Sequence, residues 1–263
     1  MEFEHIVYEK RGGIGYITIN RPDVLNALHP AANREMGDAF RDFRDDPDVR
    51  VAILSGAGDK AFCAGNDLKY MAKHGKPGEP YPDADKYALG GITEKFTCWK
   101  PIIAAVHGFA MGGGFEVALA CDIIIATEGA RFALPETRVG VVASASGPHR
   151  IVRQLPLNTA MGMLLTGKPI TATEGHRWGL VNEVVPSLTE LIPVAERWAN
   201  EILECAPIST RATKQVALMG LNTTLESAIN RDYSEYRRAR LSNDFIEGPR
   251  AFAEKRKPIW TGE

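Results

Sequence analysis

A change of pattern near residue 187 constrains the fold of this 263-residue chain more than any other feature. Before it, short apolar runs at 102–106 and 122–126 are typical of buried strands, and they flank a helical stretch at 112–120. Nearer the N-terminus the pattern predicts strands at 6–8, 14–19 and 49–55 and a helix at 31–43. Alternating strands and helices predict an α/β protein with stacked sheets crossed by helices, although periodicity alone leaves the arrangement of the sheets open.

Only helices are predicted after Ser187, at 194–203, 207–219, 225–242 and 251–255. Such a helical tail is too small to bury a separate core, so we expect it to pack on the α/β core or on another subunit. We therefore divide the chain into a core at 1–186 and a C-terminal helical region at 187–263. Within the core, the stretch 74–83 is rich in proline, glycine and charge and predicts a loop.

Three consecutive glycines, Gly112-Gly113-Gly114, open the predicted helix and precede the carboxylate of Glu116; a second carboxylate, Glu136, closes the run 130–136. Addition of water to a double bond conjugated with a carbonyl needs a base for the water, an acid for the α-carbon and donors for the enolate oxygen. Two carboxylates and a glycine-rich turn could supply all three. Equally, Glu116 could be an ordinary charge at a helix N-terminus and Glu136 a helix cap.

Four ordered motifs resemble signatures of the enoyl-CoA hydratase/isomerase (crotonase) superfamily. They are NRP at 20–22 with NAL at 26–28, AFCAGNDLK at 61–69, MGGGFEVALACD at 111–122, and LPE at 134–136 with Gly140. The resemblance extends from about residue 5 to Trp260. Within the superfamily, three further segments look most like the carnitinyl-CoA dehydratase branch: FRDDP at 43–47, RWG at 177–179, and EGP at 247–249 with AFAEKR at 251–256.

The resemblance implies a fold and a catalytic site. The fold would be a crotonase-like spiral of β-β-α units, with a C-terminal helical region that mediates formation of a homotrimer, often paired into a hexamer. Glu116 and Glu136 match the two catalytic glutamates of the family. The N–H groups of Asn66 and Gly113 would form the oxyanion hole that holds the thioester oxygen.

The resemblance also implies contacts with an acyl-CoA substrate. Ala64 and Asn66 would offer backbone groups to the adenine and thioester portions, and Asp67, Leu68 and Lys69 continue the same motif. Lys69 could meet a CoA phosphate or be an ordinary exposed lysine. Two residues of the tail match positions that can contact CoA in the family, namely Tyr236 and Lys255. The other basic residues around them could equally form a solvated helix face.

One segment departs from the family pattern. After Gly140 the family hydratases usually carry Pro-Gly and then Gly-Gly-Thr, whereas this chain reads VVASASGPH at 141–149. Because this segment borders the acyl pocket in the family, we expect it, together with 70–89, to determine the acyl group. Its serines and His149 lack a Gly-x-Ser-x-Gly motif, which disfavours a serine hydrolase. We expect His107 to be a structural histidine.

Composition excludes other classes. The net charge of −2 argues against a nucleic-acid surface, and no apolar run approaches the roughly 20 residues that a membrane helix needs. The acidic start, Met1-Glu2-Phe3-Glu4, lacks the positive charge of a targeting segment. Four separated cysteines show no spacing that suggests a metal site. We therefore expect a cytoplasmic protein with reduced thiols, without a metal or a membrane or nucleic-acid partner.

We predict a lyase that adds water to a 2-enoyl-CoA thioester or removes it in the reverse reaction. It would need no dissociable cofactor, because CoA is part of the substrate. The alternatives are a carnitinyl-CoA dehydratase-like or Δ3-Δ2-enoyl-CoA isomerase activity and, from another class, a non-enzymatic RNA-binding member of the family. Two glutamates favour water chemistry, because an isomerase can work with one.

Overall fold

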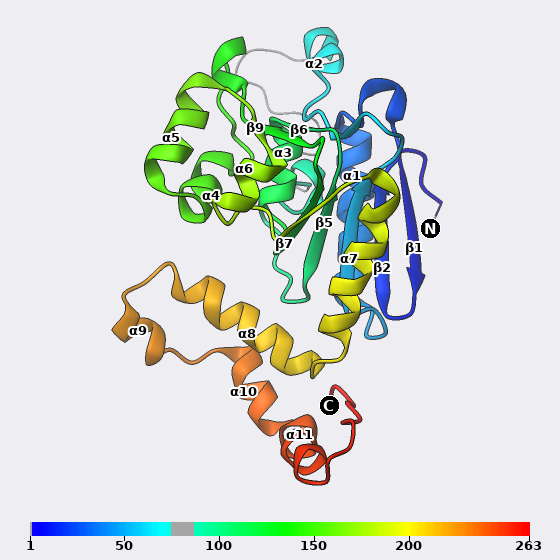
Figure 1. The fold of residues 1–263 in the computed structure, drawn as a ribbon, viewed down its shortest axis with the longest axis vertical. Helices are drawn as coiled ribbons and strands as arrows, with labels where there is room; N and C mark the ends of the chain where they lie inside the picture. The colour runs from blue at the N-terminus through cyan, green and yellow to red at the C-terminus, as the bar shows by residue number, and fades with distance from the viewer. Residues whose placement is uncertain (1, 75–86) are drawn as a thin grey trace.

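The structure, a computed structural model, describes residues 2–74 and 87–263 and is built around two sheets (Figure 1). The larger sheet contains, in spatial order, β1 (Ile6–Arg11), β2 (Ile14–Ile19), β3 (Val51–Gly56), β5 (Ile102–Val106), β7 (Ile123–Thr127) and β10 (Glu183–Val185). The smaller sheet contains β4 (Ala61–Cys63), β6 (Phe109–Met111), β8 (Arg131–Ala133) and β9 (Ile170–Thr171).

The chain steps repeatedly from the larger sheet to the smaller one. Strands β3, β5 and β7 are parallel neighbours, and each is followed by a short strand, β4, β6 or β8, which are parallel neighbours in the second sheet. Among the paired strands of the described residues, the hairpin β1–β2 and the pair β8–β9 are antiparallel. The repeated strand–strand step with intervening helices produces the spiral of β-β-α units that the resemblance implies.

Helices cover both faces of the larger sheet. On one side, α1 (Pro30–Asp45) buries Met36, Phe40 and Phe43, which are fully buried in the main core cluster. On the other side, α7 (Leu188–Leu203) packs Leu191 and its small neighbours against the sheet in a second cluster. The remaining helices of the core are α2 (Leu68–His74), α3 (Gly113–Leu119), α4 (Gly147–Gln154), α5 (Leu157–Thr166) and α6 (Ala172–Arg177).

The core elements that were predicted end within a few residues of the observed ones, but β4, β6, β8, β9, β10, α2, α4, α5 and α6 were not predicted. Three predictions for the tail were wrong. The helix at 194–203 is α7, which begins at Leu188. The single helix at 225–242 is two helices, α9 (Leu225–Ile229) and α10 (Ser234–Leu241). The Asn230 amide caps α9 by donating to the Glu226 carbonyl, and the buried Tyr233 donates its hydroxyl to the Ala228 carbonyl. The helix at 251–255 is α11 (Asp244–Ala253) and begins earlier. The predicted loop at 74–83 lies, except for His74, outside the described residues.

The division at 186/187 stays a prediction, and α7 belongs physically with the core sheet. The chain leaves the core at α8 (Pro207–Gly220), after which α8 to α11 extend away from the sheets (Figure 1). Their own buried cluster consists of Ile208, Ala212 and Ala239. None of the helices in the described ranges is long and apolar enough to cross a membrane.

The tail exposes more apolar surface than a monomer normally leaves in water. Large apolar side chains that are more than half exposed include Leu221, Leu225, Ile229, Leu241, Phe245, Ile246, Phe252 and Ile259. A face of this size favours burial against another copy of the chain, in line with the predicted trimer or hexamer.

We therefore expect light scattering at micromolar concentration to give a trimer or hexamer. Replacement of Leu241 and Phe252, which are 82% and 88% exposed, by aspartate should dissociate it, because each carboxylate would have to be buried unpaired. Far-UV circular dichroism checks that the variant is folded. A wild-type mass equal to one chain would contradict the prediction.

Candidate active site

Three glycines shape the turn between β6 and α3. Gly112 has a φ of 53°, in the left-handed region that favours glycine. Gly114 packs so closely on the end of β4 that a Cβ there would overlap the Cys63 carbonyl. The glycines therefore allow the N-terminus of α3 to approach the loop that follows β4.

At this contact the backbone amides of Asn66 and Gly113 come together. Gly65 has a φ of 90°, and a Cβ added to it would lie 2.9 Å from the Gly113 nitrogen. A Cβ added to Gly113 would lie 3.5 Å from the Asn66 nitrogen. In the described part of the chain, neither amide donates a hydrogen bond. Two adjacent amides without an acceptor can stabilise an oxygen on which negative charge develops.

Glu116 lies in the first turn of α3 and is only 2% exposed. Its Oε1 accepts a hydrogen bond of 2.7 Å from the Gly147 amide at the start of α4. Burial raises the pKa of Glu116 to about 7, against the lowering effect of the Gly147 amide, and the charge of Glu136 raises it further. Near neutral pH this carboxyl group can therefore either take up or release a proton.

Glu136 begins the short 3-10 helix η3 (Glu136–Val139). Its Oε1 lies against Gly112, where an added Cβ would come within 2.8 Å of it. Its Oε2 is buried, with no hydrogen-bond partner among the described residues. Burial raises the pKa of Glu136 above its ordinary value. Leaving a buried polar atom without a hydrogen-bond partner costs free energy. This oxygen is therefore a candidate to bind water or substrate.

Strand pairing brings together two glutamates that are far apart in the sequence. β6 and β8 are parallel neighbours in which Met111 pairs with Ala133. The segments that follow these residues leave the same edge of the sheet, so α3 with Glu116 and η3 with Glu136 start side by side. Glu136 therefore lies beside Gly112, next to the paired amides, and close enough to Glu116 for its charge to raise the Glu116 pKa.

A family model described as enoyl-CoA hydratase/isomerase matches residues 9–263. The chain belongs to the enoyl-CoA hydratase/isomerase family.

Its relatives within the family match it over nearly their full length. A carnitinyl-CoA dehydratase of Proteus mirabilis (strain HI4320) is 44% identical over 262 residues, which cover 96% of each chain. That of Escherichia coli (strain K12) is 43% identical, covering 98% of this chain and 99% of its own. The crystal structure of enoyl-CoA hydratase from Mycobacterium tuberculosis H37Rv superposes with a TM-score of 0.91 at 35% identity, with coverage of 98% and 99%. The predicted crotonase fold is confirmed.

The proposed substrate residues of this family member after β4 are only partly available for a ligand. Asp67 pairs with Arg21 at 3.2 Å and accepts the Tyr70 amide at 3.0 Å, so its carboxylate is engaged within the protein. Leu68 and Lys69 are exposed at the start of α2, and Ala64 is half-buried beside the paired amides.

Tyr236 and Lys255 are not brought to the glutamates of the same chain. Tyr236 is 52% exposed on α10, and Lys255 is exposed just after α11. Figure 1 shows both helices well separated from α3.

Sequence reasoning missed Gly147 and Leu89. A Cβ at Gly147 would come within 2.7 Å of the Glu116 Oε1, and a Cβ at Gly113 would collide with the Leu89 side chain. Gly147 stands in the segment that departs from the family pattern and opens α4. A glycine at the start of a helix indicates a backbone amide that a carboxylate can approach closely. Only the fold identifies Glu116 as the partner of the Gly147 amide.

Of two polar residues that the sequence singled out near this site, Ser146 is hydrogen-bonded within the protein and His107 is buried. The Ser146 hydroxyl donates to the Thr93 carbonyl and accepts from Arg150 at 2.9 Å, which is inconsistent with an activated nucleophile. His107 is 2% exposed, and burial lowers its pKa. Its Nε2 has no hydrogen-bond partner among the described residues. The expected structural role of His107 stays a prediction.

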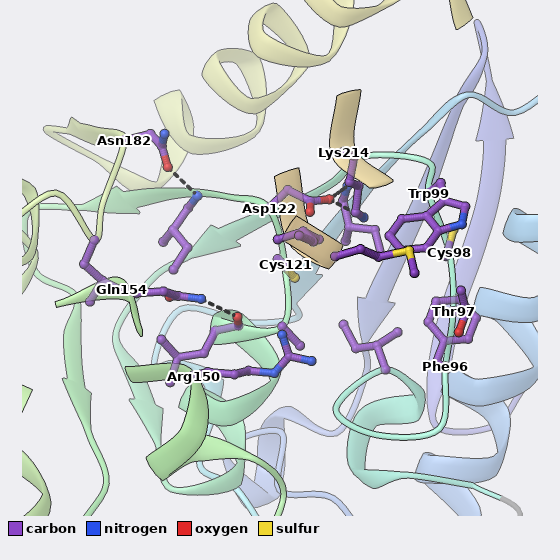
Figure 2. A pocket seen from close by; sticks show the side chains of 18 of the residues that line it. Phe96, Thr97, Cys98, Trp99, Cys121, Asp122, Arg150, Gln154, Asn182 and Lys214 are labelled. Carbon is purple, nitrogen blue, oxygen red and sulfur yellow. Dashed lines mark hydrogen bonds and ion pairs between the residues drawn. The ribbon is translucent and has the colours of Figure 1, made fainter. Parts of the chain in front are cut away.

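Two of the cavities that the described residues line bear on the site, and one of them is lined by a glutamate of the site. A cavity of about 500 Å³ lies where α8 meets the core, and Lys214 of α8 pairs there with Asp122 at 2.7 Å (Figure 2). Neither Glu116 nor Glu136 lines this cavity. A cavity of about 370 Å³ is lined by Glu136 and by mostly aliphatic side chains. This second cavity is the candidate space for an acyl group.

The buried carboxyl of Glu116 predicts a pH-dependent stability. Its pKa is raised from 4.5 to about 7, so between these pH values the folded chain holds a proton that the unfolded chain releases. The free energy of unfolding should therefore fall as pH rises through this window, by on the order of 3 kcal/mol. Glu116→Gln, which stays neutral and keeps an acceptor for Gly147, should flatten the dependence and raise the melting temperature at about pH 8.

Melting temperatures of wild type and Glu116→Gln, measured at about pH 5 and about pH 8 and at one protein concentration, test this expectation. A wild-type stability that rises with pH relative to the variant would show that the carboxylate is stabilised, rather than penalised, by its surroundings.

Proposed function

We propose that the protein hydrates the double bond of a 2-enoyl-CoA thioester, and catalyses the reverse dehydration, without a dissociable cofactor. The proposal rests on two carboxyl groups with raised pKa values, of which Glu116 is buried and Glu136 is half-buried beside Gly112. It rests also on the two neighbouring amides of Asn66 and Gly113, which have no acceptor among the described residues. Family membership gives the thioester class, and the geometry supports water chemistry within it.

In the proposed reaction, the amides of Asn66 and Gly113 hold the thioester oxygen. Glu116, in its ionised form, takes a proton from water as the water oxygen bonds to the β-carbon. The electron pair of the double bond moves toward the thioester, and negative charge develops on the oxygen held by the amides. Glu136, in its protonated form, delivers its proton to the α-carbon. A proton must then pass from Glu116 back to Glu136 before the next turnover.

The raised pKa values support proton transfer by both carboxyl groups, while the division of roles between them rests on the family resemblance. Glu116, with a pKa of about 7, is partly ionised at neutral pH and can act as a base. Glu136 is also shifted toward its protonated form by burial, and its Oε2 has no partner in the described structure. Two side chains of the same type can act as an acid and a base only where the protein environment adjusts the pKa of each.

We further propose that CoA lies across the loop after β4, with the backbone at Ala64 and the side chain of Lys69 facing it. Helix α10, which carries Tyr236, and helix α11, which precedes Lys255, lie apart from α3 (Figure 1). In the proposed oligomer Tyr236 and Lys255 would contact CoA bound to a neighbouring chain.

Absorbance of the conjugated thioester distinguishes the two reactions. With but-2-enoyl-CoA a hydratase should remove this absorbance, and with 3-hydroxybutanoyl-CoA it should create it. A Δ3-Δ2 isomerase should instead create it from but-3-enoyl-CoA and leave but-2-enoyl-CoA unhydrated. Turnover of but-3-enoyl-CoA alone would overturn the proposal. An RNA-binding function would require a salt-sensitive shift of RNA in a gel, which the net charge of −2 disfavours.

A further inference from the structure

The cavity next to Glu136 has an unusually uniform lining. The turn after η3 and the helices α4 and α5 line an open depression of about 370 Å³ with aliphatic side chains, of which Val142 and Leu165 are 73% and 69% exposed. These include Val142, Ala143, Val152, Met161, Leu164 and Leu165. The two polar residues of the lining are Glu136 itself and Thr137, whose hydroxyl donates to the Leu164 carbonyl at 3.4 Å.

The position of the cavity fits the distal part of an acyl chain. Glu136 has one carboxylate oxygen against Gly112, beside the paired amides, and the same residue lines the cavity. A thioester whose oxygen meets those amides would place its α-carbon near Glu136 and direct the rest of the acyl group into the aliphatic space.

A fixed positive charge on the acyl group does not suit this space. Proteins hold quaternary ammonium groups with aromatic faces, and none of the described residues that line the cavity is aromatic. The only carboxylate in the described lining is Glu136. A cation beside it would favour its ionised form and lower its pKa, which would remove the proton that the mechanism needs.

On the basis of the function proposed above, we propose that the acyl group is uncharged and aliphatic, and that an acyl group carrying a trimethylammonium group is a poor substrate. This assigns the chain a substrate class different from the one that the names of its carnitinyl-CoA dehydratase relatives indicate.

The test uses the full-length protein and two substrates of matched shape. One is the CoA thioester of 4-trimethylammonio-but-2-enoate, and the other is 5,5-dimethylhex-2-enoyl-CoA, in which carbon replaces the charged nitrogen. We expect kcat/KM for hydration to be at least roughly tenfold higher for the neutral thioester, because a fixed charge loses part of its hydration against an aliphatic lining. Hex-2-enoyl-CoA should exceed but-2-enoyl-CoA by at least roughly tenfold, since added methylenes fill the cavity.

A pair of variants on α5 links the preference to the cavity. Met161→Glu places a carboxylate in the lining, at a side chain that is 37% exposed. It should reduce the neutral-to-charged ratio of kcat/KM by at least roughly tenfold. Leu157→Glu adds the same charge on the same helix at a residue that is 61% exposed and outside the lining, and should leave the ratio unchanged. Far-UV circular dichroism confirms folding of both.

The outcomes separate the two proposals. Hydration of none of the four thioesters would overturn the proposed function and, with it, this inference. Hydration in which the trimethylammonium substrate equals or exceeds its neutral counterpart would overturn only the inference. Equal shifts in both variants, or none in folded Met161→Glu, would show that the aliphatic cavity does not hold the acyl group.

Discussion

Glu116→Gln and Glu136→Gln should each lower kcat for hydration by roughly 10²–10⁴-fold. Glutamine keeps the volume and an acceptor oxygen, so Glu116→Gln preserves the bond from the Gly147 amide, which is 2.7 Å long in the wild type. Neither glutamine can exchange the proton that the mechanism moves. KM should change little, because the oxygen of the thioester is held by backbone amides rather than by these side chains. Initial rates with an enoyl-CoA that the wild type hydrates measure both effects.

A nearby carboxylate provides the control. Glu94 is exposed and contributes to the electrostatic potential at Glu116, but it stands outside the site. Glu94→Gln should therefore retain turnover close to the wild-type value. Because Glu116 and Glu136 act in the same addition reaction, the double variant should lose less than the product of the two single losses. A steep loss in one single variant and almost none in the other would point to an isomerase mechanism.

Local sequence patterns predict the core of the fold, but they do not predict the geometry of the site. The strand at 102–106 was predicted with the bounds of β5, because a short, continuous apolar run is typical of a buried strand. The tail was harder to predict, since the break between α9 and α10 depends on the burial of Tyr233 and on capping at Asn230. These are tertiary and side-chain effects that a helical period does not contain.

The same limit applies to the site residues. The glycines at 112–114 predicted a turn, and the family resemblance predicted Glu116 and Glu136 as the catalytic residues. Their proximity requires the pairing of β6 with β8, which places two residues twenty positions apart at one sheet edge. The contact between Gly147 and Glu116 and the shape of the aliphatic cavity depend on how α4 and α5 pack against the core. No motif in the segment 141–149 encodes that position, so the acyl preference could be argued only from the structure.

The amide of Gly113 can be removed with little harm to the helix that it begins. Gly113 is the first residue of α3, a position where proline is well tolerated because its missing N–H has no partner within the helix. Any side chain at this position must displace Leu89, which lies over the Cα. Gly113→Ala meets the same obstacle and keeps the N–H group, so the two variants differ in the donor and in the proline Cδ that takes the place of the amide hydrogen. A Leu89→Ala background relieves the collision in both.

In that background, Gly113→Pro should turn over roughly 10²–10³-fold more slowly than Gly113→Ala, the usual cost of losing one oxyanion donor. The loss should fall on kcat rather than KM, because the hydrogen bond strengthens as negative charge develops on the thioester oxygen. Similar far-UV spectra and melting temperatures would show that α3 forms in both variants. Equal turnover of the two folded variants would mean that the Gly113 amide does not stabilise the transition state, and that the reacting oxygen is held elsewhere than between Asn66 and α3.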